Sequence, residues 1–128
     1  MGIDIYASWR GQTPDEQHAQ VTGFSVVHGN VGYLREAYHG EPYATRILMP
    51  EAFEHEIYPD GAPIAASVLR ERLPKALAAA IDRERRVYDA EPLAKETIDV
   101  LQSYRDFVAL CEAKERETGA PCIINASY

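Results

Sequence analysis

The first residues of the chain alternate between apolar and polar side chains, which predicts a half-buried β-strand over residues 2–9. The apolar side consists of Ile3, Ile5, Ala7 and Trp9. The polar side consists of Asp4, Tyr6 and Ser8. Residues 10–19 are mostly polar and predict a connector, in which Thr13 caps a short helical turn that begins with Pro14 and has Glu16 three residues after the cap.

Two β-prone runs, residues 21–28 and 31–35, then flank the dipeptide Gly29-Asn30. A two-residue loop with glycine first is typical of a type II′ turn, so the pattern predicts a β-hairpin.

Residues 36–58 allow two interpretations. In the first, Glu41-Pro42 begins a short helix that carries Tyr43, Arg46 and Ile47, and a further turn begins at Pro50. In the second, residues 44–49 are extended. A turn at residues 59–61 closes the region in both.

Helical spacing dominates the second half of the chain. Residues 65–73 predict a helix. Pro74 either kinks this helix or is the first residue of a new one. The apolar stripe of this region consists of Leu73, Leu77, Ala80, Ile81 and Tyr88. A second long helix is predicted to begin at Pro92 and to end before Gly119, and its stripe consists of Leu93, Thr97, Val100, Leu101, Tyr104, Phe107, Val108 and Cys111. Residues 122–127 are short, apolar and β-prone, which predicts a final strand.

Strands at both ends of the chain and two long helices between them predict an α+β fold. We expect a small, mainly antiparallel sheet, formed by the N-terminal strands and the C-terminal strand, packed against the two helices of the second half. A length of 128 residues without repeats or linkers predicts a single domain over residues 1–128.

Composition and charge narrow the function classes. The net charge of −7 argues against direct nucleic-acid binding, which needs clustered basic side chains, and is compatible with a basic protein partner. The sequence has no apolar run of about 20 residues and no basic leader, so we expect a cytoplasmic protein without membrane association. The two cysteines, Cys111 and Cys122, are expected to be buried free thiols.

Residues 33–46 form the most distinctive stretch, because tyrosine, arginine and histidine are concentrated around a Gly-Glu-Pro turn. Residues 1–64 contain only three basic side chains against nine acidic ones, and two of those three lie in this stretch. Arginine can hold a phosphate or carboxylate with two hydrogen bonds, and tyrosine can stack on a flat ring. The leading hypothesis is therefore a small anionic or nucleotide-like ligand, bound by Tyr33, Arg35, Tyr38, His39, Tyr43 and Arg46.

Other interpretations of the same residues remain open. Arg35 could pair with a neighbouring glutamate, and Asp4 and Tyr6 could line the same site or face solvent. His39 with Glu36 or Glu41 is a weak candidate for general acid–base catalysis in a small hydrolase or transferase. We expect no catalytic nucleophile, no cofactor and no metal site, since the four histidines stand singly.

The acidic surface suggests a different class of function, a protein-interaction module or a phage or bacterial inhibitor that meets a basic partner. The charged run at residues 82–86 is expected to be a solvent-exposed helix face. The stripe around Tyr104, Phe107 and Cys111 is expected to be core, with a homodimer seam as the alternative.

The opening Met-Gly-Ile-Asp-Ile-Tyr and the run Gly-Tyr-Leu-Arg-Glu-Ala-Tyr-His-Gly-Glu-Pro-Tyr-Ala-Thr-Arg resemble a group of small uncharacterised bacterial and phage proteins. The resemblance covers mainly the first 60 residues. It implies a bacterial or phage cytoplasmic protein and assigns no catalytic residue to this chain.

Overall fold

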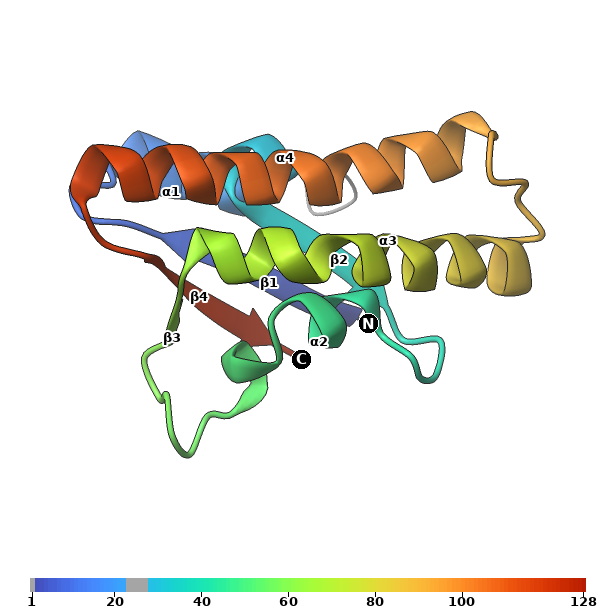
Figure 1. Cartoon of the computed structure of the whole chain (residues 1–128), viewed down its shortest axis with the longest axis horizontal. Coiled ribbons are helices and arrows are strands. Elements are labelled where there is room, and N and C mark those ends of the chain that lie inside the picture. Colours follow the sequence, from blue (N-terminus) through green and yellow to red (C-terminus); the bar gives the residue numbers. More distant parts are fainter. Residues whose placement is uncertain (1, 23–27) are drawn as a thin grey trace.

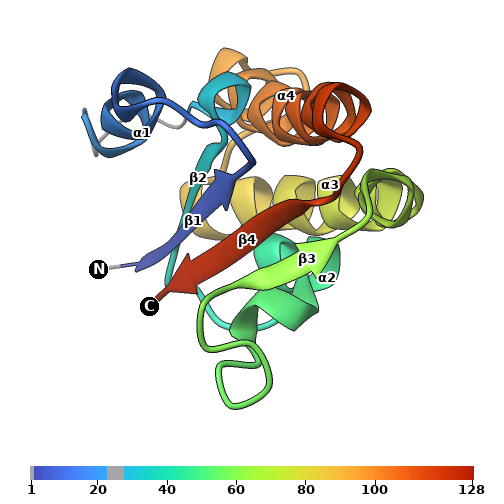
Figure 2. The same cartoon turned by 90° about the vertical axis from the view of Figure 1, so that its left-hand side faces the viewer.

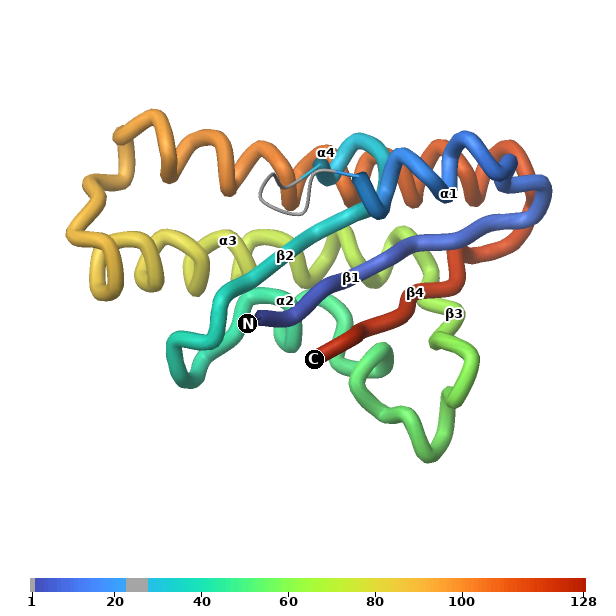
Figure 3. Tube along the Cα trace, turned by 180° about the vertical axis from the view of Figure 1, so that it is seen from behind, coloured from blue at the N-terminus to red at the C-terminus, as the bar shows by residue number. Residues whose placement is uncertain are grey.

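The computed structural model, which describes residues 2–22 and 28–128, has an α+β fold built on a four-stranded antiparallel sheet. Across the sheet the strands follow the order β2-β1-β4-β3. Their bounds are Gly2–Ser8 for β1, Tyr33–Ala37 for β2, Ala62–Ile64 for β3 and Cys122–Ser127 for β4. The long helices α3 (Ala66–Tyr88) and α4 (Lys95–Thr118) cover one face of this sheet, as Figures 1 and 2 show. Seen from behind, the strands lie in front of both helices (Figure 3). The predicted fold class is confirmed.

The alternation at the N-terminus produces strand β1 as expected. Its apolar residues Ile3, Ile5 and Ala7 are buried, and they face the helices. Residues of the other parity, including Asp4 and Tyr6, point to the opposite face of the sheet. Because β1 pairs with β2 on one side and with β4 on the other, it is a central strand that fixes the register of both neighbours.

The predicted cap at Thr13 is present and begins helix α1 (Pro14–Val21). The Thr13 side chain accepts a hydrogen bond from the Glu16 backbone N–H at 3.1 Å, and the Glu16 carboxylate accepts one from the Thr13 N–H at 2.9 Å. At the other end of the helix, the buried Gln20 amide donates to the carbonyls of Ala7 and Val31 at 2.7 and 2.8 Å. These contacts hold α1 against the end of β1.

The predicted hairpin around Gly29-Asn30 is wrong where the structure describes it. Val21 belongs to α1, and residues 29–31 form a 3₁₀ turn, η1 (Gly29–Val31), in place of a type II′ turn. Residues 23–27 of the predicted first strand lie outside the described residues. Close packing explains the difference, because a Cβ atom on Gly29 would lie 1.8 Å from the carbonyl oxygen of Ser103 in α4. The strand that does form here, β2, pairs with β1 instead.

The helical interpretation of residues 36–58 is confirmed in outline, but the helix begins after Tyr43 and not at Glu41-Pro42. The extended interpretation of residues 44–49 is wrong. Helix α2 (Ala44–Leu48) follows Pro42, and a 3₁₀ turn, η2 (Pro50–Phe53), follows it. Strand β3 was not predicted, since three residues with a central proline give no period-2 signal. Its proline is exposed on the edge of the sheet, where a missing N–H breaks no ladder hydrogen bond.

The two long helices differ from expectation mainly at their ends. Helix α3 continues through Pro74, so a new helix does not begin there. Helix α4 begins at Lys95, and Pro92 lies in the connection before it. The core lies between these helices and the sheet, and its largest side chains include Tyr104, Phe107, Leu69 and Ile124. The Tyr104, Phe107 and Cys111 stripe is core, as expected.

Cys111 and Cys122 are buried free thiols, which confirms the prediction. None of the helices described here has the length and hydropathy needed to span a bilayer.

Candidate functional site

The distinctive segment 33–46 passes from β2 through a loop into α2, so its side chains point in different directions. Along β2, Leu34 and Glu36 face the helices, while Tyr33 and Arg35 lie on the other face of the sheet. The six predicted ligand-binding residues therefore belong to separate groups of contacts.

On the outer face of the sheet, Asp4 joins Tyr33 to Arg35. Its carboxylate oxygen Oδ1 accepts a hydrogen bond from the Tyr33 hydroxyl at 2.6 Å and from Arg35 Nη1 at 2.7 Å. Asp4 and Arg35 are directly opposite each other in the β1–β2 register. Burial and the bond to Asp4 raise the pKa of Tyr33 to about 12, and the same carboxylate raises the pKa of Arg35. Arg35 thus pairs with an aspartate on the next strand rather than with a neighbouring glutamate.

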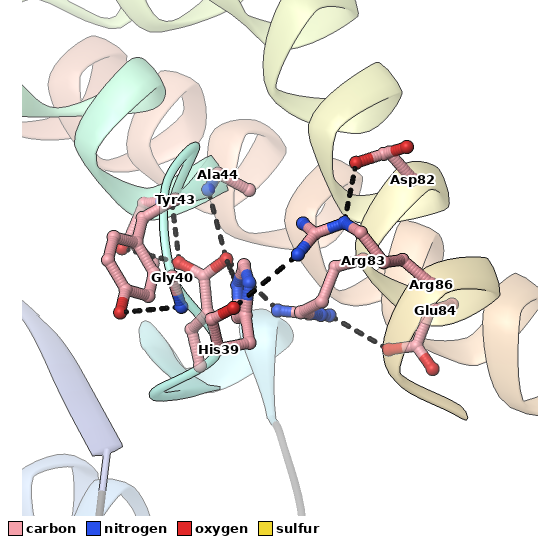
Figure 4. A network of polar contacts seen from close by, with 10 residues as sticks. His39, Gly40, Tyr43, Ala44, Asp82, Arg83, Glu84 and Arg86 are labelled. Atoms are coloured by element: carbon pink, nitrogen blue, oxygen red, sulfur yellow. Dashed lines mark hydrogen bonds and ion pairs between the residues drawn. The ribbon is translucent and has the colours of Figure 1, made fainter. Parts of the chain in front are cut away.

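On the helix face of β2, Glu36 is a fully buried carboxylate. It accepts hydrogen bonds from the backbone N–H groups of Ala44 and Thr45 at 2.9 and 3.0 Å, and from the Thr45 hydroxyl at 2.7 Å. The first two donors are at the start of α2, where helical N–H groups lack partners within the helix. Arg83 Nη1 from α3 lies 3.1 Å from Glu36 Oε2. Figure 4 shows the Arg83 side chain between His39 and Glu84 in this network. Glu36 therefore connects β2, α2 and α3.

His39 belongs to the same buried network. Its Nε2 lies 3.1 Å from Glu36 Oε2, and its ring packs on Tyr43 with the centroids 4.7 Å apart. The side chains of His39 and Glu36 are 1% and 0% exposed, so a substrate cannot reach this acid–base pair without displacing the loop. Glu41, the other candidate partner, is exposed. In this structure His39 joins the loop after β2 to the buried carboxylate of Glu36.

Arg83 is a buried arginine that the sequence pattern did not identify. Its Nη2 donates to Glu84 at 2.9 Å in addition to the bond with Glu36. Burial acts to lower the pKa of Arg83, but Tyr104, Glu36 and Glu84 outweigh burial and raise it. The expectation that residues 82–86 form a solvent-exposed face is wrong for Arg83 and Glu84, because this side of α3 faces β2. The sequence does contain one indication that Arg83 is buried. Arg83 follows the buried Ala80 and Ala76 by three and seven residues, which places all three on the same face of the helix.

The remaining predicted residues lie apart from these two groups. The Arg46 guanidinium stacks over the Phe53 ring at 4.3 Å and lies 5.4 Å from the Tyr128 ring centroid. Tyr38 is exposed and Tyr43 is half-buried. No described contact joins Arg46 to Arg35, so the structure does not bring the two arginines to one anion.

A concave surface of about 830 Å³ opens beside the outer edge of β2, and we call it the β2 groove. It lies between that edge, the distal part of α3, the α3–α4 connection and the first turns of α4. Figure 1 shows that this end of the helical hairpin projects beyond the sheet. The lining residues are Arg35, Ala37, Arg83, Glu84, Tyr88, Asp89, Ala90, Glu91, Ala94, Glu96 and Val100.

The charges around the β2 groove are not balanced. Both of its arginines are engaged, Arg35 by Asp4 and Arg83 by Glu36 and Glu84. The three acids near the connection, Asp89, Glu91 and Glu96, are exposed, and none of them forms an ion pair with another described residue. Lys95, next to Glu96, pairs with Asp99 instead, although Glu96 also contributes to raising the pKa of Lys95. The free charge that the groove offers to a partner is therefore negative.

The described residues contain no cluster of three or more histidine, cysteine, aspartate or glutamate side chains arranged to hold a metal ion. Comparison of the chain with protein-family models, with curated proteins and with solved structures finds no match. Functional assignment therefore depends on the residues of the β2 groove and on the contacts of segment 33–46.

Proposed function

We propose that this protein is a recognition domain that binds a basic polypeptide segment in the β2 groove. The observation that carries the proposal is the set of unpaired acids, Asp89, Glu91 and Glu96, around a concave surface whose arginines are already neutralised. Charge complementarity of this kind steers encounter and selects partners by sign. The net charge of −7 acts in the same direction at longer range.

Exposed apolar side chains near the groove support a polypeptide partner. Leu93, in the α3–α4 connection, is 86% exposed, and Tyr88 is 55% exposed. Val87 and Ile98, on the adjoining turns of α3 and α4, are also exposed. Apolar side chains gathered beside a polar rim are typical of surfaces that bind another protein.

A small anionic or nucleotide-like ligand is the second candidate. It is supported by the groove volume, which lies within the range of roughly 300–1,000 Å³ of small-molecule sites. It is the weaker proposal for two reasons. Arg35 and Arg83 are already paired with carboxylates, and Arg46 lies outside the β2 groove, over the Phe53 ring.

Titration with a panel of nucleotides distinguishes the two candidates. If the partner is a basic polypeptide, we expect no saturable binding of any nucleotide. Saturable binding that Arg35→Ala abolishes in a folded protein would favour the nucleotide.

Selection from a library of random 12-residue peptides displayed on phage tests the leading proposal. With the parent protein as bait, we expect enrichment of peptides rich in lysine and arginine. The double variant Glu91→Lys/Glu96→Lys should lose this enrichment. A matched variant, Glu54→Lys/Glu56→Lys, changes the net charge equally at exposed sites outside the groove lining and should retain it. The proposal fails if no peptide is enriched, or if basic peptides are enriched equally on both variants.

A further inference from the structure

Strand β2 is at one end of the strand order, and among residues 2–22 and 28–128 no strand pairs with its outer edge. The register and one hydrogen bond fix which backbone groups face that edge. The Ala7 N–H donates to the Gly32 carbonyl at 2.9 Å, so the pair formed by residues 7 and 32 is a hydrogen-bonded pair. Every second pair of an antiparallel ladder is of this type. The backbone groups of Leu34 and Glu36 therefore point to β1, and those of Arg35 and Ala37 point away from it.

An independent contact agrees with this assignment. Tyr33 has the same parity as Arg35 and Ala37, and its N–H donates away from β1, to the His28 carbonyl at 3.2 Å. Beyond Tyr33, the outward-facing residues of β2 are Arg35 and Ala37, and both line the β2 groove. An edge with unpaired N–H and C=O groups is a template for another extended chain.

We propose that the basic segment binds as an added β-strand on the outer edge of β2, exchanging backbone hydrogen bonds with Arg35 and Ala37. The inference rests on the proposed function and specifies its binding mode. In an added strand, alternate side chains point to the helix side, where Asp89, Glu91 and Glu96 lie on or beside α3 and α4. Basic residues at every second position of the partner then meet these acids, while backbone pairing supplies affinity that does not depend on sequence.

Charge argues against a second copy of this chain as the occupant. Pairing β2 with the β2 of a second copy would bring two acidic grooves together in chains that each carry a net charge of −7. Like charges placed opposite each other across an interface disfavour association.

The test uses the tightest-binding basic peptide from the display selection, synthesised unmodified and in two N-methylated series. One series is methylated at odd positions and the other at even positions. Only one set of peptide N–H groups faces the partner strand, so we expect about 30-fold weaker binding in one series and less than threefold change in the other. Equal effects in the two series would overturn strand addition while leaving the basic-segment function intact. Failure to select any peptide would instead overturn the proposed function.

Amide hydrogen exchange supplies a second readout on the protein. We expect the amides of Arg35 and Ala37 to exchange rapidly in the free protein and at least about tenfold more slowly with saturating peptide, whereas Leu34 and Glu36 are protected in both states. Protection of Arg35 and Ala37 in the free protein would overturn the proposal, because the edge would already be occupied. Protection that rises with protein concentration would identify a second copy as the occupant and would also overturn it.

A pair of substitutions at one position completes the test. Ala37→Pro removes the outward N–H and leaves the hydrogen bonds between β1 and β2 in place, since proline is tolerated on the exposed side of an edge strand. Ala37→Val keeps the N–H and serves as the control. Strand addition predicts about tenfold weaker peptide binding by Ala37→Pro than by Ala37→Val, with both variants folded by circular dichroism. Equal binding would contradict it.

Discussion

Arg83 Nη1 lies 3.1 Å from Oε2 of Glu36, and both side chains are almost completely buried. The pair connects α3 to the edge strand β2, 47 residues away along the chain. Glu36 also holds the start of α2, so one carboxylate positions three elements around segment 33–46. A buried charge is tolerated only when it is paired and hydrogen-bonded, and Glu36 is both.

Replacing this carboxylate should destabilise the fold severely. Glu36→Gln leaves Arg83 as a buried charge with one partner fewer and places an amide NH₂ group against hydrogen-bond donors. We expect a loss of about 3–5 kcal/mol in the free energy of unfolding, measured by urea denaturation. The control is Glu112→Gln, which breaks the exposed pair with Arg70 and should cost about 0–1 kcal/mol. Similar losses in the two variants would show that Glu36 does not have this structural role.

The approach of η1 to α4 leaves no room for a side chain at Gly29. An alanine Cβ atom there would lie 1.8 Å from the Ser103 carbonyl oxygen, so the backbone must move. We expect Gly29→Ala to lower the melting temperature and to cost about 2–3 kcal/mol. Gly11→Ala is the comparison, because apart from the neighbouring residues in the chain no atom would lie within 4 Å of the new Cβ, and only the φ of +81° is strained. It should cost about 1 kcal/mol, and an equal or larger cost at Gly11 would contradict the packing argument.

The capping box of α1 predicts a local effect. Thr13→Ala removes the acceptor for the Glu16 N–H and should cost about 1 kcal/mol of helix stability. Amide exchange measured residue by residue should show faster opening of α1, while α4 keeps its protection. Thr22→Ala, at the other end of the same helix, removes only a longer hydrogen bond to the Ala19 carbonyl, at 3.4 Å, so it is the control and should change exchange little. If the two variants open α1 equally, the cap is not what stabilises it.

Tyr33 gives the pH prediction. Its pKa of about 12 in the fold lies above the value near 10 of an exposed tyrosine. The folded state therefore favours the protonated phenol, and this contribution is complete below about pH 10 and is lost as the pH rises from about 10 through about 12. Tyrosinate absorbance should show a component with a midpoint near 12 that Tyr33→Phe removes. The exposed-residue variant Tyr38→Phe should retain it, and its loss in both variants or in neither would refute the assignment.

Local sequence patterns predicted the elements whose stability is mainly local or strongly periodic. Strands β1 and β4, the Thr13 cap and the long helix α4 follow from alternation, capping chemistry and helical spacing. The hairpin prediction failed because β-propensity around Gly29-Asn30 gives way to tertiary contacts. The Gln20 amide binds the Val31 carbonyl and the α4 backbone lies directly against Gly29, so residues 29–31 form a 3₁₀ turn.

The site was harder to predict, because its contacts join residues far apart in the chain. Asp4 and Arg35 were recognised separately, and only the β1–β2 register brings them together. The charge pattern predicts a solvated helix face for Arg83 and Glu84, since nothing local shows that a buried glutamate on β2 lies opposite. The acids in and beside the α3–α4 connection could not be predicted as site residues, because only the folded structure places them around a groove.

The most direct test of binding in the β2 groove is photo-cross-linking with the selected basic peptide, carrying one benzophenone group, followed by mass spectrometry of the digested complex. We predict cross-links within residues 35–37 and 84–100 that unlabelled peptide competes away and that Glu91→Lys/Glu96→Lys weakens about tenfold. Cross-links concentrated on the exposed acids Glu54 and Glu56, or spread evenly over the acidic surface, would contradict recognition in the groove.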